Sequence, residues 1–149
     1  MRAVVQRVHA ARVEVDGTTI GSIGRGLLVF LGIGRRDGSN SVSYLADKVV
    51  DLRVFPSDGR PMHRSVRDVR GEILLVSQFT LFGDCRRGRR PSFDEAMDPG
   101  AAESLYHDFA RSLSERGFPP QQGVFGASMR VSLENDGPVT ILLDSEKAF

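Results

Sequence analysis

Two short segments of the chain combine polar groups in patterns that could perform chemistry. The first is Ser77-Gln78-Phe79-Thr80-Leu81, which directly follows the apolar run 73–76. Hydroxyl and amide groups at the end of a buried strand need partners, because a buried polar group without one costs about 1–3 kcal/mol. Either Ser77 and Thr80 bond to the neighbouring backbone, or the strand end offers N–H groups and hydroxyls to a ligand oxygen, as an oxyanion hole does.

The second segment is Asn135-Asp136-Gly137-Pro138-Val139-Thr140. Its residue types are typical of turns, so the plain interpretation is a tight hairpin turn between two strands. The alternative starts from Gly137-Pro138, because roughly one in twenty X–Pro bonds of folded proteins is cis. A cis-proline turn would project carbonyl oxygens rigidly outward. Rigid main chain can judge the shape around the α-carbon of a substrate without contacting its side chain.

A basic run follows the first segment closely. It contains four arginines within five positions, Arg86, Arg87, Arg89 and Arg90. Guanidinium groups bind phosphates well, which favours contact with nucleic acid. The alternative is a solvated loop without a ligand. The net charge of +1 excludes a generally basic nucleic-acid-binding protein, but it leaves room for a local basic patch.

Several other chemistries are excluded by the sequence. It has no Gly-x-Ser-x-Gly nucleophile motif and no phosphate-binding Gly-x-x-x-x-Gly-Lys loop. Its three histidines lack metal-ligand spacing, and no side chains form an evident nucleophile–base pair. We therefore expect no metal and no cofactor. The single cysteine, Cys85, fits a reducing compartment, and no apolar run approaches the ~20 residues of a membrane span, so a cytoplasmic protein is expected.

The spacing of apolar residues predicts the framework around these segments. Alternation predicts one long strand over residues 2–16, or two with a break, followed by a hairpin turn at Asp16-Gly17. Further strands are expected over 27–33, 52–55, 72–82, 128–134 and 139–144. Helices are expected over 40–50, capped by Asn40 or Ser41, and from Pro99 to about Arg116, ended by Gly117. Because the strands cluster, one α+β domain over residues 1–149 with a mixed or mainly antiparallel, barrel-like sheet is predicted.

These motifs together resemble the D-aminoacyl-tRNA deacylase family, and the resemblance covers essentially the whole chain. The pair Ser-Gln-Phe-Thr and Gly-Pro-Val-Thr, in this order, is specific. It is accompanied by the segments 2–8, 26–29, 52–55, 89–93 and 123–127. The resemblance implies an enzyme that hydrolyses the ester bond of D-aminoacyl-tRNA and of glycyl-tRNA(Ala), releases free tRNA, and rejects L-aminoacyl-tRNA.

The resemblance also implies an assembly and a fold. It implies a homodimer with active sites at the subunit interface and a β-barrel-like sheet with two main helices packed outside. Ser77, Gln78, Phe79 and Thr80 would line the pocket. Gly137 and Pro138, joined in cis, would enter the pocket of the partner subunit and exclude L-amino acids by steric clash. The chain departs from the family over 59–65, where it reads Gly59-Arg60-Pro61-Met62-His63-Arg64.

The absence of an evident base suggests substrate assistance. The ribose hydroxyl beside the aminoacyl ester would activate or position water, while backbone N–H groups of Phe79 and Thr80 stabilise the oxyanion. Three alternatives stay open. They are a non-catalytic nucleic-acid-binding module using Arg86–Arg90, a hydrolase of another ester or amide with Ser77 or Thr80 as nucleophile, and a purely structural dimer.

Overall fold

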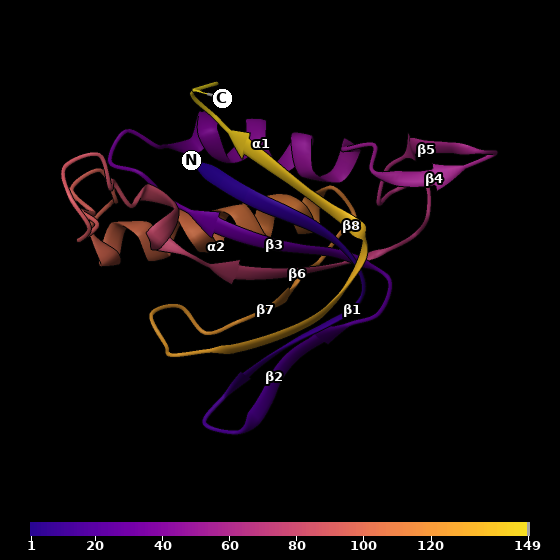
Figure 1. The fold of residues 1–149 in the computed structure, drawn as a ribbon, viewed down its shortest axis with the longest axis horizontal. Helices are drawn as coiled ribbons and strands as arrows, with labels where there is room; N and C mark the ends of the chain where they lie inside the picture. The colour runs from indigo at the N-terminus through magenta and orange to yellow at the C-terminus, as the bar shows by residue number, and fades with distance from the viewer. Residues whose placement is uncertain (149) are drawn as a thin grey trace.

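The computed structural model of the chain describes residues 1–148. A six-stranded mixed sheet carries two α-helices on one face, and a separate two-stranded sheet projects at one end (Figure 1). In chain order the elements are β1 (Arg2–Val15), β2 (Thr18–Ile23), β3 (Gly26–Gly32), α1 (Ser39–Asp51), β4 (Phe55–Ser57), β5 (Arg60–Arg64), β6 (Glu72–Ser77), the 3-10 turn η1 (Phe79–Phe82), α2 (Pro99–Glu115), β7 (Gln121–Gln122) and β8 (Arg130–Asp144).

Strand β1 organises the large sheet. One edge of β1 pairs antiparallel with β8 over almost its full length. The other edge pairs with β3 through its first half and with β2 through its second half, in both cases antiparallel. Strand β6 then lies parallel to β3, and β7 lies parallel to β6. The parallel register places Ser77, the last residue of β6, beside Leu31 near the end of β3.

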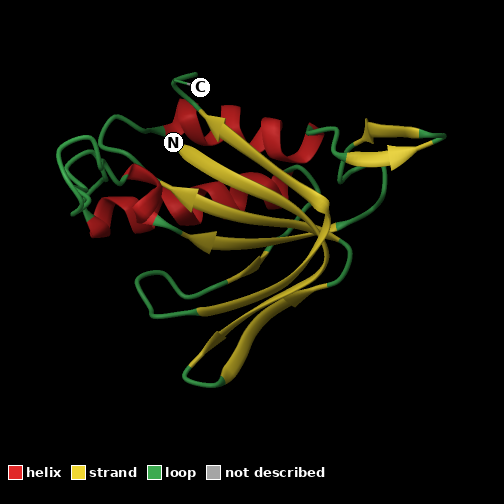
Figure 2. Cartoon of the chain, in the orientation of Figure 1, coloured by secondary structure: helices red, strands yellow, loops and turns green. Residues whose placement is uncertain are grey.

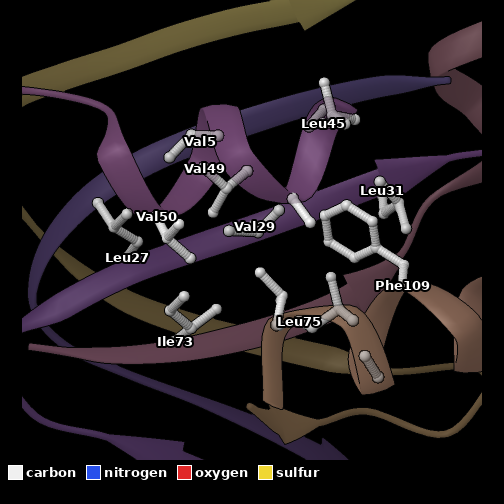
Figure 3. Close-up of a cluster of buried hydrophobic side chains, with 14 of the residues drawn as sticks. Val5, Leu27, Val29, Leu31, Leu45, Val49, Val50, Ile73, Leu75 and Phe109 are labelled. Carbon is white, nitrogen blue, oxygen red and sulfur yellow. The ribbon is translucent and has the colours of Figure 1, made fainter. Parts of the chain in front are cut away.

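Both faces of β3 and β6 are buried, which explains their continuous apolar sequences. Alternate residues of these strands face α1 and α2, as the packing of Leu27, Val29 and Leu31 against the helices illustrates (Figure 3). The intervening residues, among them Leu28 and Leu74, form a second cluster on the opposite face.

The sheet is strongly curved (Figure 2), and the second cluster joins residues of β1, β2, β3 and β6. Strand β2 approaches β7 so closely that a Cβ added to Gly21 would lie 3.0 Å from the carbonyl oxygen of Gln122. The predicted α+β class with a mixed, barrel-like sheet and two helices outside is therefore confirmed. None of the helices among residues 1–148 has the length and apolar character needed to cross a bilayer.

Most of the predicted elements are present, but the strand expected over 72–82 is too long. Strand β6 ends at Ser77, and after Gln78 the four residues Phe79–Phe82 form the turn η1. The apolar pattern misled the prediction because Phe79, Leu81 and Phe82 continue it through the turn. The expected cap of the first helix is also wrong, since α1 begins at Ser39 with Gly38 as its N-cap.

The strand expected over 52–55 is displaced and has an unpredicted partner. Strand β4 begins at Phe55 and runs through Pro56, where the prediction ended it. A turn at Asp58-Gly59, both with positive φ, reverses the chain into β5. Proline is tolerated because a two-stranded sheet has open edges that require no donor from it.

The hairpin turn expected at 135–138, between strands 128–134 and 139–144, is also wrong. Strand β8 is continuous from Arg130 to Asp144, because its partner β1 is equally long and accompanies it through this region. The pairing shifts register between Gln6 and Val8, where the extra residues of β8 bulge from the ladder, and between Val8 and Ala10, where the extra residue is His9 of β1.

Candidate active site

A cavity of about 680 Å³ opens where the carboxyl ends of the parallel strands β3 and β6 lie side by side. Its size lies within the range of ordinary small-molecule sites. Ser77, Gln78 and Phe79, three of the four predicted catalytic residues, line it. The fourth, Thr80, is exposed and lies next to this wall in the turn η1.

The turn η1 presents backbone N–H groups beside the cavity. The Gln78 N–H donates to the carbonyl oxygen of Leu31 at 2.8 Å, which ties the entrance of the turn to β3. Within the turn, the first donor is Leu81, whose N–H bonds to the Gln78 carbonyl oxygen at 3.3 Å. The N–H groups of Phe79 and Thr80 precede this first bond, so the turn itself supplies them with no acceptor.

Side chains of the turn also interact with one another. The Gln78 amide Nε2 donates to the Thr80 hydroxyl, and this bond holds both side chains in place. Phe79 is 58% exposed, a high fraction for a phenylalanine. Its ring meets the ring of Phe93 edge to face, with centroids 5.0 Å apart. The cavity wall is thus continuous from the turn to the segment that precedes α2.

The remaining walls come from segments that the sequence analysis did not assign to the site. They are the end of β3, the segment before α2 together with its first turn, and the loop between β7 and β8. Their lining residues include Arg35, Phe93, Asp94, Met97, Asp98 and Phe125. The apolar residues within predicted loops, such as Phe93 and Phe125, were the available signal.

The cavity wall offers no nucleophile with an adjacent base. Its ionisable side chains are Arg35, Asp94 and Asp98, and the described hydrogen bonds join neither Ser77 nor Thr80 to a carboxylate or a histidine. Behind the wall, burial raises the pKa of the Tyr106 phenol far above its ordinary value, so this group stays protonated and donates to the Leu75 carbonyl oxygen at 3.0 Å. Within residues 1–148, no group of three or more acidic, histidine or cysteine side chains could hold a metal ion.

The basic run forms a loop anchored beside the cavity. Asp84 and Ser92 exchange two backbone hydrogen bonds, at 2.7 and 2.9 Å, and so close the base of the loop. Arg86 points back to the carboxylate of Asp84, with its Nε and Nη2 atoms 2.6–3.1 Å from the two oxygens. This guanidinium holds the pKa of the Asp84 carboxyl well below its usual range.

The other arginines of the loop differ from Arg86. Arg87, Arg89 and Arg90 are exposed, and within residues 1–148 none of them forms an ion pair. Three of the four predicted phosphate-binding side chains are thus available to a ligand, while the first one stabilises the loop.

Gly137 and Pro138 lie outside the cavity of their own chain. Both are exposed, and the peptide bond that joins them is cis, as the resemblance implied. The Asn135 side chain bridges the bulge by accepting the Val139 N–H at 3.0 Å. Gly137 has a φ of +133°, and a Cβ added to it would lie 2.8 Å from a methyl carbon of Val139, so only glycine fits here.

Arg7 holds this bulge, and the sequence analysis did not include it in the site. Only 7% of Arg7 is exposed. Its Nε atom donates to the Asp136 carbonyl oxygen at 3.0 Å, its Nη2 atom donates to the Asp136 carboxylate at 3.2 Å, and Nη1 donates to the Val54 carbonyl oxygen. A charged residue on the inward-facing parity of a strand was the signal, because a buried charge requires partners.

Comparison with known proteins places this geometry in a family. The model of the family described as D-Tyr-tRNA(Tyr) deacylase matches residues 4–144. The chain belongs to this family. It is 55% identical to the D-aminoacyl-tRNA deacylase of Thermotoga petrophila and 52% identical to that of Thermosipho africanus, in both cases over the whole of both chains. A relative from Thermodesulfovibrio yellowstonii is 54% identical and matches 97% of this chain and 99% of its own.

Two solved structures share the fold of this chain. A protein described as c-Myc DNA Unwinding Element Binding Protein is 44% identical, with a TM-score of 0.93 over 97% of this chain and 98% of its own. A probable eukaryotic D-amino acid tRNA deacylase is 16% identical, with a TM-score of 0.81 over 95% and 97%, and supports the fold alone. The departure from the family motif over 59–65 falls on the β4–β5 hairpin, outside the cavity.

The buried bonds of Arg7 predict a large effect on stability. Replacing Arg7 by Ala leaves the Val54 carbonyl and the Asp136 carboxylate without their donor, so the free energy of unfolding should fall by about 3 kcal/mol. Urea denaturation measures this change. Arg12→Ala, on the same strand, is the control. The Arg12 side chain is 57% exposed and lies 3.8 Å from Glu14, so its loss should change stability by less than about 0.5 kcal/mol. Equal effects of the two substitutions would contradict the structural role of Arg7.

Proposed function

We propose that this protein hydrolyses the ester bond of D-aminoacyl-tRNA, releasing free tRNA and the D-amino acid, and that it also acts on glycyl-tRNA(Ala). The observation that carries the proposal is the cavity at the ends of β3 and β6. Its wall includes Ser77, Gln78 and Phe79, lies beside the backbone N–H groups of Phe79 and Thr80, and lacks a nucleophile–base pair. Full-length identities of 52–55% to D-aminoacyl-tRNA deacylases support it.

The chemistry follows from what the wall can offer. Hydrolysis of the ester passes through a tetrahedral intermediate with a negative oxygen, and the N–H groups of Phe79 and Thr80 are the donors for that oxygen. Each such donor lowers the barrier by about 2.7–4 kcal/mol. Water must be activated as well. The ribose hydroxyl beside the ester lies within reach of the reacting carbon in every aminoacyl-tRNA and takes this part.

Chirality is judged by a second copy of the chain. Gly137 and Pro138 are exposed and held stiffly by Arg7 and Asn135, but they lie outside the cavity of their own chain. Within the described residues, β8 pairs only with β1, and its exposed Leu133 and Leu142 offer apolar surface to a partner. In a homodimer the bulge of one subunit enters the partner's cavity, where it leaves no room for an L side chain and admits glycine.

The tRNA is bound along the basic loop. Arg87, Arg89 and Arg90 meet phosphates near the aminoacylated end, because the loop begins at Asp84, directly after the turn that lines the cavity. The protein acts in the cytoplasm, where aminoacyl-tRNA is found.

Deacylation assays test the function and the mechanism together. Purified protein should release the amino acid from D-aminoacyl-tRNA and glycyl-tRNA and leave L-aminoacyl-tRNA intact. A D-aminoacyl-tRNA that lacks the neighbouring ribose hydroxyl should react at least about a hundredfold more slowly, since positioned hydroxyl groups contribute several kcal/mol. Equal cleavage of this substrate would reject substrate assistance, and failure to cleave any D-aminoacyl-tRNA would reject the function.

Thr80→Ala separates the main-chain mechanism from a covalent one. The substitution keeps the backbone N–H, so we expect deacylation to fall by no more than about tenfold, the effect of losing the hydroxyl that orients Gln78. Complete loss of turnover in a folded variant that still binds tRNA would instead favour Thr80 as the nucleophile.

Gly137→Ala tests the assignment of chiral selection. Because the added methyl group would lie 2.9 Å from the Val139 amide nitrogen and 3.2 Å from the Arg7 guanidinium, it must displace the bulge. We expect D-aminoacyl-tRNA deacylation or its preference over the L-isomer to fall at least about tenfold, equivalent to 1.4 kcal/mol. The control is Gly17→Ala, because Gly17 in the β1–β2 turn also has a positive φ, +79°, and has open space around it. If Gly137→Ala keeps the activity and selectivity of the unmodified protein, the assignment of chiral selection to this bulge is wrong.

Salt dependence tests the basic loop. Replacing Arg87, Arg89 or Arg90 by Ala should each weaken tRNA binding and reduce the slope of log K against log salt by roughly one. Arg86→Ala should leave the slope nearly unchanged, because Asp84 already neutralises this guanidinium. Identical slopes for all four variants would contradict the distinction between Arg86 and the other three arginines.

A non-catalytic nucleic-acid-binding module is the second candidate. It is favoured by the similarity to the protein described as c-Myc DNA Unwinding Element Binding Protein. Salt-sensitive binding of RNA or DNA, with no ester cleavage of any aminoacyl-tRNA, is the outcome that distinguishes it.

A further inference from the structure

Among the described residues that line the cavity, Arg35 alone carries a basic side chain. Its backbone position is fixed from two sides. Arg35 follows the end of β3 by three residues, and its N–H donates to the Glu95 carbonyl oxygen at 3.1 Å. The adjacent bridge between Gly34 and Ala96 joins the same two segments. Arg35 is therefore anchored at the cavity's rim, beside the strand end that carries the turn η1.

The Arg35 guanidinium has no ionic partner within residues 1–148, although carboxylates are close in the sequence and in the cavity wall. The Asp37 carboxylate is occupied by the Met1 amine and by the Gly34 N–H at 2.7 Å. Asp94 accepts the Ser92 hydroxyl at 2.7 Å. The neighbouring Arg36, in contrast, pairs with Glu146 at 2.8 Å and does not line the cavity. Two successive arginines thus have different roles, one on the surface and one at the rim.

The cavity wall carries negative charge, so an anionic ligand can enter only if a cation offsets that charge. Asp94 and Asp98 both line the cavity, and their carboxylates alone would repel a phosphate. Arg35 offsets this repulsion and offers a planar set of donors that matches phosphate oxygens. Its backbone bond to Glu95 joins it to the segment that follows the basic loop 86–90.

We propose that Arg35 binds the phosphodiester on the 5′ side of the terminal nucleotide of the substrate. This inference rests on the proposed function, which places the ester carbonyl at the N–H groups of Phe79 and Thr80. The 5′-phosphate is separated from that ester by a single ribose. The ends of β3 and β6 are neighbours in the sheet, so Arg35 and the turn η1 can hold the two ends of one nucleotide. Arg35 is thus a substrate-binding residue that fixes the ester relative to the oxyanion donors.

Two non-hydrolysable probes test this assignment on the full chain. They are 3′-(D-alanylamino)-3′-deoxyadenosine and its 5′-monophosphate, whose dissociation constants are measured by isothermal titration calorimetry. In the unmodified protein the 5′-phosphate should tighten binding at least about tenfold, as expected for a charge-assisted hydrogen bond. In Arg35→Ala this ratio should fall to near one, while the affinity for the unphosphorylated probe stays within about twofold. Arg35→Lys should keep part of the ratio, because it retains the charge and loses the fork.

Arg36→Ala is the matched control and should keep the full ratio. Three results would overturn the proposal: a ratio near one in the unmodified protein, equal weakening of both probes by Arg35→Ala, or no binding of either probe. Deacylation of D-aminoacyl-tRNA by the same preparations reports separately on the proposed function. Active enzyme with no phosphate effect on the probes would reject the role of Arg35 alone, whereas inactive enzyme would reject the function itself.

Discussion

The guanidinium of Arg7 connects β1 to two segments that are far apart in the sequence, the one at Val54 and the bulge of β8 at Asp136. It is buried on the long strand β1 and donates to the Val54 carbonyl and to both the carbonyl and the carboxylate of Asp136. These bonds fix a bulge in β8 at the point where the register with β1 shifts. The Gly137-Pro138 main chain is therefore presented at the surface in one orientation. A rigid main-chain probe requires such a support, because a mobile one would adapt to either stereoisomer.

The cavity, like the bulge, depends on backbone groups. The parallel pairing of β3 and β6 brings two strand ends together, and the turn η1 that follows β6 supplies no acceptor to the N–H groups of Phe79 and Thr80. Backbone donors held by a sheet need no reorganisation during a reaction, which is the main requirement for stabilising an oxyanion. The side chains of the turn then serve to shape the wall. In the proposed mechanism, a substrate hydroxyl takes the task that other hydrolases assign to a histidine or a carboxylate.

The sequence predicted local features well and distant ones poorly. Strict alternation identified β1, and a proline followed by helical spacing and a glycine identified α2, because these signals lie within the element itself. The predicted turn at 135–138 was wrong because the length of β1, far away in the chain, decides that β8 continues. Ser77 and Phe79 were assigned to the site from their motif. Arg35 reaches the cavity through tertiary contacts, and the apolar character of Phe93 and Phe125 within loops did not indicate which cavity they line. Arg7 was visible as a charge on an inward-facing position, yet its partner Asp136 was 129 residues away.

The central claim is that two copies of the chain build each active site. Complementation tests it most directly, using one variant with a displaced bulge, Gly137→Ala, and one with a filled cavity, Ala127→Trp. Each homodimer should deacylate D-aminoacyl-tRNA at least about tenfold more slowly than the unmodified protein. After co-refolding in equal amounts, half of the dimers are mixed and one of their two sites has both parts intact, so roughly one quarter of the activity should return. A mixture as inactive as its parents, or a fully active monomer, would contradict the account.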